Sequence, residues 1–251
     1  MAKIVVGVSL KMYFGHRAAL GWFDRVAGVA RTHAGVTGGD VNLFVLPTYL
    51  QVADAIAAFA GTRVMVGAQD VATEDAGAFT GEVSAAELRE VGALLAEVGH
   101  AERRRLFGDT DTVTARKTAA ALRNGLTPVL CLGETDRMDA ADAAGATIAQ
   151  LHTDLDGVGP GPIIAAYEPV WAIGASEPAP VAHIRVVTLA LRDALGSARP
   201  GSRVIYGGSA GPGLLTRLGD AVDGLFLGRF AHDPDALAAV LDEAAALAAR
   251  R

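Results

Sequence analysis

The 251-residue chain is poor in cysteine and in lysine: it has one cysteine, Cys131, and three lysines, Lys3, Lys11 and Lys117. A single cysteine cannot form an internal disulfide, which fits a reducing compartment. The net charge of -6 argues against non-specific nucleic-acid binding, which depends on a basic face. The apolar start IVVGVSL is cut by Lys11 and is followed by no small-residue cleavage pattern. We therefore expect a cytoplasmic protein with no signal peptide, no membrane span and no nucleic-acid partner.

Patterns for metals and organic cofactors are also missing. The six histidines show no metal-ligand spacing with cysteine or acidic residues. The chain contains no Walker loop and no GxGxxG after its first apolar run. Cys131 lies inside an apolar run and is expected in the core. We expect neither a metal nor a cofactor.

Short apolar runs alternate with longer helix-like segments along the whole chain. Continuous apolar runs bounded by turns are typical of strands buried on both faces, and their alternation with helices predicts βαβ units. Eight such units match the size of a (β/α)8 barrel, and no flexible linker divides residues 1–251, so we expect one α/β domain of this fold. A doubly wound open sheet is the alternative. The runs are residues 3–10, 41–47, 63–70, 94–99, 128–134, 162–168, 203–208 and 223–228.

Polar residues gather where these runs end. In barrel enzymes the loops after the strands carry the active site. Lys11 follows the first run, His100 the fourth, and Glu168 closes the sixth. Glycine-rich turns at 206–213 and 226–230 follow the last two runs, and their backbone amides could hold a phosphate. The sequence therefore predicts one site on one rim.

Each of these groups has a catalytic and a structural interpretation. Glu168, walled by Tyr167, Pro169 and Trp171, is expected to be partly desolvated when the loop covers it, which favours a base, although a rim salt bridge would also explain it. His100 at a helix start near Ala101 would be kept neutral by the helix dipole and could donate to a carbonyl, or it could be purely structural. Lys11 could bind a phosphate or an oxyanion, or could extend into solvent.

Six motifs, in order along the chain, resemble those of the triose-phosphate isomerase family. The resemblance implies a (β/α)8 barrel, usually a homodimer, that interconverts dihydroxyacetone phosphate and glyceraldehyde 3-phosphate in glycolysis and gluconeogenesis without a cofactor. The motifs are LKM at 10–12, GAFTGEVS at 77–84, GHAERR at 99–104, CLGE at 131–134, YEPVWAIG at 167–174 and YGGS at 206–209.

Carried over by position, the resemblance implies that Glu168 is the general base and His100 the electrophile. Lys11 would be the substrate-binding cation, and Glu102 a supporting carboxylate. The phosphate site would include Gly174, Ser209 and Gly228, and residues 169–179 would form a lid. Within the lid we single out Pro169, Val170, Trp171, Ala172, Ile173 and Gly174. The loop at 78–82 reaches the partner subunit in the family, which implies a dimer interface at Thr80, Gly81 and Glu82.

The chain departs from the family at several site positions. Ser9 stands in place of an asparagine, Ala101 in place of a serine, and Arg229 in place of the second of two glycines. The lid carries Ser176 and Glu177 where the family usually has Gly and Lys. Because the changes spare the base, the histidine and the lysine, we expect the reaction type to be kept, with Ser9 and Arg229 beside the substrate.

The substrate is less constrained than the reaction type. We expect isomerisation of a small ketose phosphate, with triose phosphates as the first expectation. The alternative is an erythrulose phosphate, because a smaller residue at Ser9 could admit an extra hydroxymethyl group. An alternative from another class is a barrel that binds a phosphorylated metabolite without catalysis, against which the complete set of Lys11, His100 and Glu168 argues.

Overall fold

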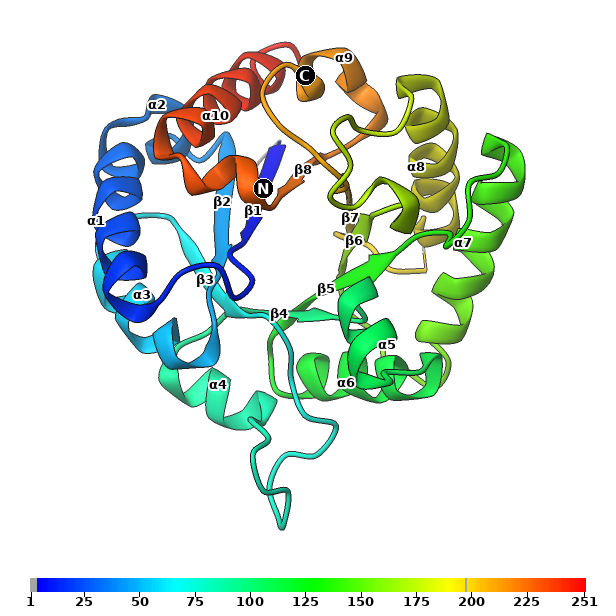
Figure 1. Ribbon diagram of the computed structural model, residues 1–251, viewed down its shortest axis with the longest axis horizontal. Coiled ribbons are helices and arrows are strands. Elements are labelled where there is room, and N and C mark those ends of the chain that lie inside the picture. The colour runs from blue at the N-terminus through cyan, green and yellow to red at the C-terminus, as the bar shows by residue number, and fades with distance from the viewer. Residues whose placement is uncertain (1–3, 197) are drawn as a thin grey trace.

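The apolar runs form a closed parallel barrel in a computed structural model of the protein, which describes residues 4–196 and 198–251 (Figure 1). Within these residues eight strands follow one another around the barrel in chain order, and β8 pairs with β1. The predicted (β/α)8 fold is confirmed, and the open sheet is excluded. The strands are β1 Ile4–Ser9, β2 Val41–Leu46, β3 Met65–Ala68, β4 Leu95–Val98, β5 Thr127–Leu132, β6 Ile164–Tyr167, β7 Arg203–Tyr206 and β8 Gly224–Leu227.

Helices surround the barrel (Figure 1). They are α1 His16–Thr32, α2 Ala34–Thr37, α3 Val52–Ala58, α4 Ala85–Val91, α5 Ala101–Phe107, α6 Asp111–Arg123, α7 Ala140–Asp154, α8 Val181–Leu195, α9 Leu214–Leu218 and α10 Pro234–Ala248. Short 3₁₀ segments lie between them: η1 Tyr49–Gln51, η2 Val170–Ala172, η3 Gly219–Ala221 and η4 Arg229–His232. Over the described residues, no helix combines the length and the apolar composition needed to cross a bilayer.

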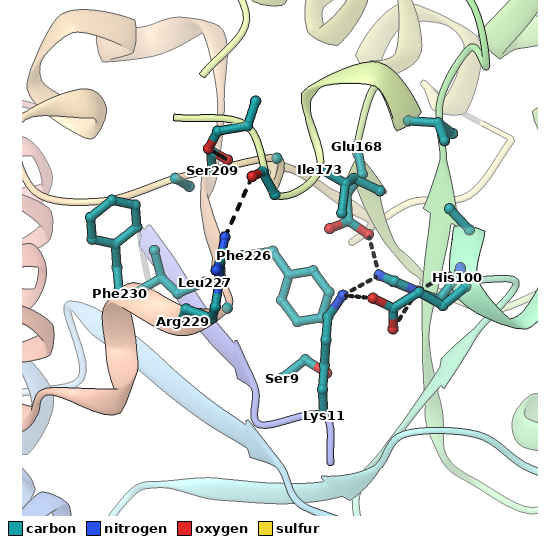
Figure 2. Close-up of a pocket in the computed structure, with 18 of the residues that line it drawn as sticks. Ser9, Lys11, His100, Glu168, Ile173, Ser209, Phe226, Leu227, Arg229 and Phe230 are labelled. Atoms are coloured by element: carbon teal, nitrogen blue, oxygen red, sulfur yellow. Dashed lines mark hydrogen bonds and ion pairs between the residues drawn. The ribbon is translucent and has the colours of Figure 1, made fainter. Parts of the chain in front are cut away.

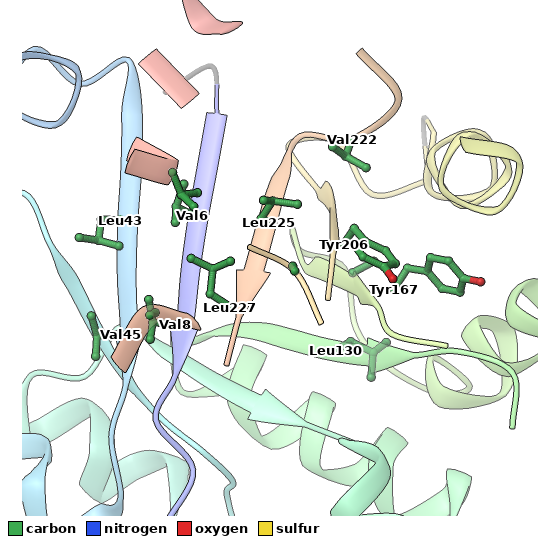
Figure 3. Packing of buried hydrophobic residues seen from close by; sticks show 14 of the residues in the cluster. Val6, Val8, Leu43, Val45, Leu130, Tyr167, Tyr206, Val222, Leu225 and Leu227 are labelled. Atoms are coloured by element: carbon green, nitrogen blue, oxygen red, sulfur yellow. The ribbon is translucent and has the colours of Figure 1, made fainter. Parts of the chain in front are cut away.

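The side chains of each strand alternate between two apolar layers, because successive residues of a strand face opposite sides. Residues such as Val6 and Leu225 face outward and pack beneath the helices (Figure 3). Val5, Phe44 and Leu95 belong to the separate cluster that fills the barrel interior. Burying each such side chain stabilises the fold by roughly 1.5–3 kcal/mol. The alternation also places Glu97, two residues after Leu95, on the interior face of β4.

The loop between β3 and α4 projects away from the barrel (Figure 1). Its base is closed by the Ala72 N–H, which donates to the Val83 carbonyl at 2.8 Å. Thr80, Gly81 and Glu82 are exposed in this loop. The structure thus places the expected interface residues on a projecting segment, while the homodimer itself stays a prediction.

Candidate active site

A cavity of about 580 Å³ opens at the C-terminal ends of the strands. The polar groups predicted to share one rim line it, as do the substituted positions Ser9, Ala101, Ser176 and Arg229, with Ser9 at the end of β1 forming part of its floor. The predicted site residues around the cavity are Ser9, Lys11, His100, Glu102, Glu168, Gly174, Ser209, Gly228 and Arg229. Across the described part of the chain, no group of three or more His, Cys, Asp or Glu side chains is arranged to hold a metal ion.

Glu168 follows β6 and is nearly buried, with 8% of its surface exposed. Its backbone N–H donates to the Leu132 carbonyl at 2.7 Å, which fixes the start of the loop. Its Oε2 is buried without a hydrogen-bond partner and lies 3.7 Å from His100 Nε2. A buried carboxylate oxygen with no protein donor is costly, and it is free to accept a proton from a ligand.

His100 caps the N-terminus of α5, so the helix start predicted near Ala101 is confirmed. Its Nδ1 accepts a hydrogen bond from the Glu102 backbone N–H at 3.1 Å. An imidazole nitrogen that accepts carries no proton, so the ring is neutral and Nε2 bears the hydrogen. That N–H is on the side of the ring facing Glu168.

Lys11 brings a second donor to the same place. Its Nζ lies 3.2 Å from His100 Nε2 and donates to Glu102 Oε1 at 2.8 Å. Burial works to lower the pKa of Lys11, but the carboxylates of Glu168, Glu102 and Glu97 outweigh it and the pKa is raised. Lysine therefore stays a cation, and an ammonium and an imidazole N–H converge where a developing oxyanion could sit (Figure 2).

Glu102 stays ionised beside this cation. Burial works to raise the pKa of Glu102, but the hydrogen bond and the charge of Lys11 lower it overall. The Glu102 side chain holds the ammonium while its backbone N–H holds the imidazole. One residue thus orients both donors.

Glu97 is a buried acid that the sequence reading did not single out. Its Oε2 accepts the Ser9 hydroxyl at 2.8 Å, and its Oε1 lies 3.9 Å from the Cys131 sulfur. Burial raises the pKa of Glu97 to about 7, with Glu168 adding to the shift and His100, Lys11 and Ser9 opposing it. The two-residue period of the run LLAEVG was the available signal, because it puts Glu97 on the same face as Leu95.

The loops after β6, β7 and β8 close the other end of the cavity (Figure 2). The Ser209 hydroxyl is within hydrogen-bond distance of the Ala172 and Ala175 carbonyls, at 3.1 and 2.7 Å. Arg229 lines the cavity, and its Nη2 donates to the Gly174 carbonyl at 3.4 Å. Among the described residues other than glycine, left-handed backbone occurs at Lys11 and Ser209, with φ of 48° and 54°, and both lie in this site.

The start of the predicted lid is held by a buried carboxylate outside the cavity. Glu134 accepts the Trp171 indole N–H at 2.8 Å and the Tyr167 hydroxyl at 3.0 Å, and His183 Nε2 lies 3.1 Å away. Glu168 is desolvated as expected, but Tyr167 and Trp171 do not form its walls, because Tyr167 belongs to the outer layer of the barrel and Trp171 donates to Glu134. Of the lid residues, Val170, Ile173 and Gly174 line the cavity, whereas Pro169, Trp171 and Ala172 connect and anchor it.

Similarity to known proteins identifies the family of the chain. A family model described as triosephosphate isomerase matches residues 4–244. The chain belongs to the triosephosphate isomerase family. It is therefore an enzyme of the isomerase kind, as the six motifs and the barrel predicted.

Relatives within the triosephosphate isomerase family carry two names. The chain is 51% identical to the L-erythrulose-1-phosphate isomerase of Pectobacterium atrosepticum, over 99% of this chain and 98% of that protein. It is 37% identical to the protein of the same name from Mesorhizobium japonicum, over 96% and 97% of the two chains. It is 38% identical to the triosephosphate isomerase of Symbiobacterium thermophilum, over 86% and 88%.

Proposed function

We propose that this isomerase acts on a four-carbon ketose phosphate of the L-erythrulose 1-phosphate kind. The 51% identity to a protein of that name, against 38% to a triosephosphate isomerase, supports this substrate. Ser9 in place of an asparagine supports it independently, since the shorter side chain leaves room in the cavity floor. The alternative substrate from the sequence thus replaces the triose phosphate expected first.

The reaction is a proton transfer between two neighbouring carbons. Glu168 removes a proton from the carbon next to the carbonyl, His100 and Lys11 stabilise the enediolate oxygens, and Glu168 returns the proton to the former carbonyl carbon. The observation that carries this proposal is the unpartnered Glu168 Oε2, 3.7 Å from a protonated His100 Nε2.

The four-carbon substrate determines what the product is. In L-erythrulose 1-phosphate the ketone is at C2, and C3 is the neighbouring carbon that bears a free hydroxyl. Transfer of the C3 proton to C2 moves the carbonyl to C3 and neither adds nor removes atoms. The product is therefore a second ketose phosphate, not the aldose that a triose substrate would give.

The phosphate would lie at the opposite end from the base. We propose that the backbone of Gly174, Ser209 and Gly228 and the guanidinium of Arg229 hold it, because all four border the cavity and an arginine can donate two parallel hydrogen bonds. Lid closure over this end would exclude water from the enediolate and prevent elimination of the phosphate.

Steady-state kinetics with L-erythrulose 1-phosphate and dihydroxyacetone phosphate test the assignment. We expect kcat/KM for the tetrulose phosphate to be larger by orders of magnitude, and the reverse order would overturn the proposed substrate.

Glu168→Gln should lower kcat by about 10²–10⁴-fold with little change in ligand affinity, because only proton transfer is removed. Unchanged turnover in this variant would exclude Glu168 as the base.

We also propose that residues 1–251 act as one domain and that two copies form a homodimer in the cytoplasm through Thr80, Gly81 and Glu82. Exposure of these residues on a projecting loop supports the interface.

A further inference from the structure

A carboxyl group lies in the barrel interior directly beneath the active site. Glu97 is 2% exposed and is aligned with Val129 of β5 in an otherwise apolar layer. Its hydrogen-bond partners are one hydroxyl and one thiol, Ser9 and Cys131. An ionisable group with so few donors is unfavourable in an apolar core, and an apolar residue of similar volume would be stable in its place. Core packing alone therefore does not explain a glutamate here.

Ser9 connects this buried carboxyl group to the cavity. Its side chain is at the cavity floor, and its hydroxyl proton points down to Glu97 Oε2 at 2.8 Å. A hydroxyl has one proton and two lone pairs, so this oxygen can offer only lone pairs to a ligand. Ser9 is therefore set to accept a hydrogen bond from a ligand O–H, whereas an asparagine at this position would also offer an amide donor.

A four-carbon ketose phosphate supplies such a donor. Compared with a triose phosphate it has one extra hydroxymethyl group, attached to the carbon that loses its proton. Glu168 and His100 fix that carbon, and the loops at Gly174 and Ser209 fix the phosphate at the other end. The extra group must then extend away from the phosphate, on the side of the cavity formed by β1 and β4, where Ser9 ends β1 and Lys11 follows it.

We propose that Glu97 positions the Ser9 hydroxyl to accept a hydrogen bond from the terminal hydroxyl of the four-carbon substrate. The inference rests on the proposed function and names a residue pair for its specificity. Glu97 does not touch the substrate; it acts through Ser9. The pair selects for the fourth carbon by pairing a hydroxyl that a triose phosphate does not have.

A purely electrostatic role for Glu97 makes a different prediction. Its charge acts on Lys11, His100 and Glu168, and each of these groups serves any substrate of the site. Removing the charge would then change the turnover of tetrulose and triose phosphates alike. The ratio of the two kcat/KM values is therefore the quantity that separates the two roles.

The experiment compares this ratio in the wild type and in Ser9→Ala, Glu97→Leu, Glu97→Gln and the Ser9→Ala/Glu97→Leu double variant. Ser9→Ala and Glu97→Leu should each lower the ratio by about 10- to 100-fold, mainly through a higher KM for the tetrulose phosphate. The double variant should be no worse than either single one, because both remove the same contact. Glu97→Gln should stay close to the wild type, since its amide oxygen can still accept the Ser9 proton.

Val129→Ala is the matched control, because it removes methyl groups beside Glu97 and leaves the Ser9 hydroxyl in place. Its ratio should equal that of the wild type.

Equal losses on both substrates, or equal effects of Glu97→Leu and Glu97→Gln, would overturn this inference while the proposed function stands. Absence of tetrulose turnover in the wild type would overturn both. Circular dichroism and thermal melts identify any variant that does not fold, and Ser9→Ala then still decides the question.

Discussion

Glu168 reaches the cavity because Gly207, the residue that follows β7 and lies beside it, has no side chain. A Cβ added at Gly207 would lie 2.5 Å from Glu168 Oε1, closer than atoms can approach. The carboxyl group ends a flexible side chain, so it would move aside and the strands would stay in place. Gly207 therefore fixes the position of the proposed base without touching the substrate.

We expect Gly207→Ala to lower kcat by about 100-fold with little change in melting temperature, because a displacement of about 1 Å at a reacting group costs that much. Gly145→Ala is the control: apart from the backbone of its own helix, no atom lies within 4 Å of its added Cβ, and it should keep full activity and gain slight stability. Normal turnover by Gly207→Ala would show that the position of Glu168 has another cause.

The raised pKa of Glu97 predicts a stability profile. Its ordinary value of 4.5 applies to the unfolded chain, and burial raises the folded value to about 7. Between these values the folded state binds the proton more tightly, so stability falls as pH rises through the interval. Relative to Glu97→Gln, the wild type should lose on the order of 3 kcal/mol of unfolding free energy between pH 4 and pH 8. Urea unfolding at several pH values measures this, and a constant difference would contradict it.

Much of the site was predictable from single residues, and some of it was not. Lys11, His100 and Glu168 each follow an apolar run, and parallel strands bring such positions to one rim. Glu97 was missed because it lies inside a run, where an acid reads as an interruption and not as part of a site. Its partner is contributed by a strand 88 positions away in sequence, which only the closed barrel reveals.

At the scale of elements, the predicted lid is joined to a hydrogen-bond network outside the cavity. Glu134 after β5 accepts hydrogen bonds from Tyr167 on β6 and from Trp171 in η2. The sequence showed Glu134 at a strand end but could not give the direction of its side chain, and His183 was only one of six histidines without metal-ligand spacing. Because three elements converge on one carboxylate, the network follows from tertiary packing and not from any local motif.

Trp171→Phe tests this anchor, because phenylalanine keeps an aromatic ring and removes the indole N–H. A hydrogen bond to a charged group contributes about 1.5–3 kcal/mol, so the closed lid should become about 10-fold less populated or more. We expect lower kcat and more inorganic phosphate released per turnover as water reaches the enediolate. Glu134→Gln keeps an acceptor and should have a smaller effect. Unchanged phosphate release in Trp171→Phe would exclude the anchor role.

At the scale of the molecule, the loop between β3 and α4 and the loops after β1 and β2 present apolar surface. Met12 and Leu50 are 89% and 88% exposed, and Phe79 lies on the projecting loop. Large exposed apolar side chains are typical of interaction surfaces. This distribution agrees with the predicted homodimer and its residues Thr80, Gly81 and Glu82.

Thr80→Arg should convert the dimer to monomer, because it adds bulk and charge where the partner is expected. Activity should fall as well, because the exposed Met12 belongs to the apolar surface assigned to the interface and directly follows Lys11 of the site. Sedimentation velocity measures the mass of the assembly. Thr153→Arg, at an exposed position of α7, is the control that should leave this mass unchanged. A monomeric wild type would contradict the prediction.

The single cysteine has a practical consequence. Cys131 is 3% exposed in the barrel wall, and burial raises the pKa of its thiol well above the usual value. A protonated, enclosed thiol reacts slowly with alkylating reagents. Iodoacetamide should therefore modify Cys131 slowly in the folded protein and faster when β5 separates from its neighbours, so the rate of alkylation would report opening of the barrel at one known position without any engineered label.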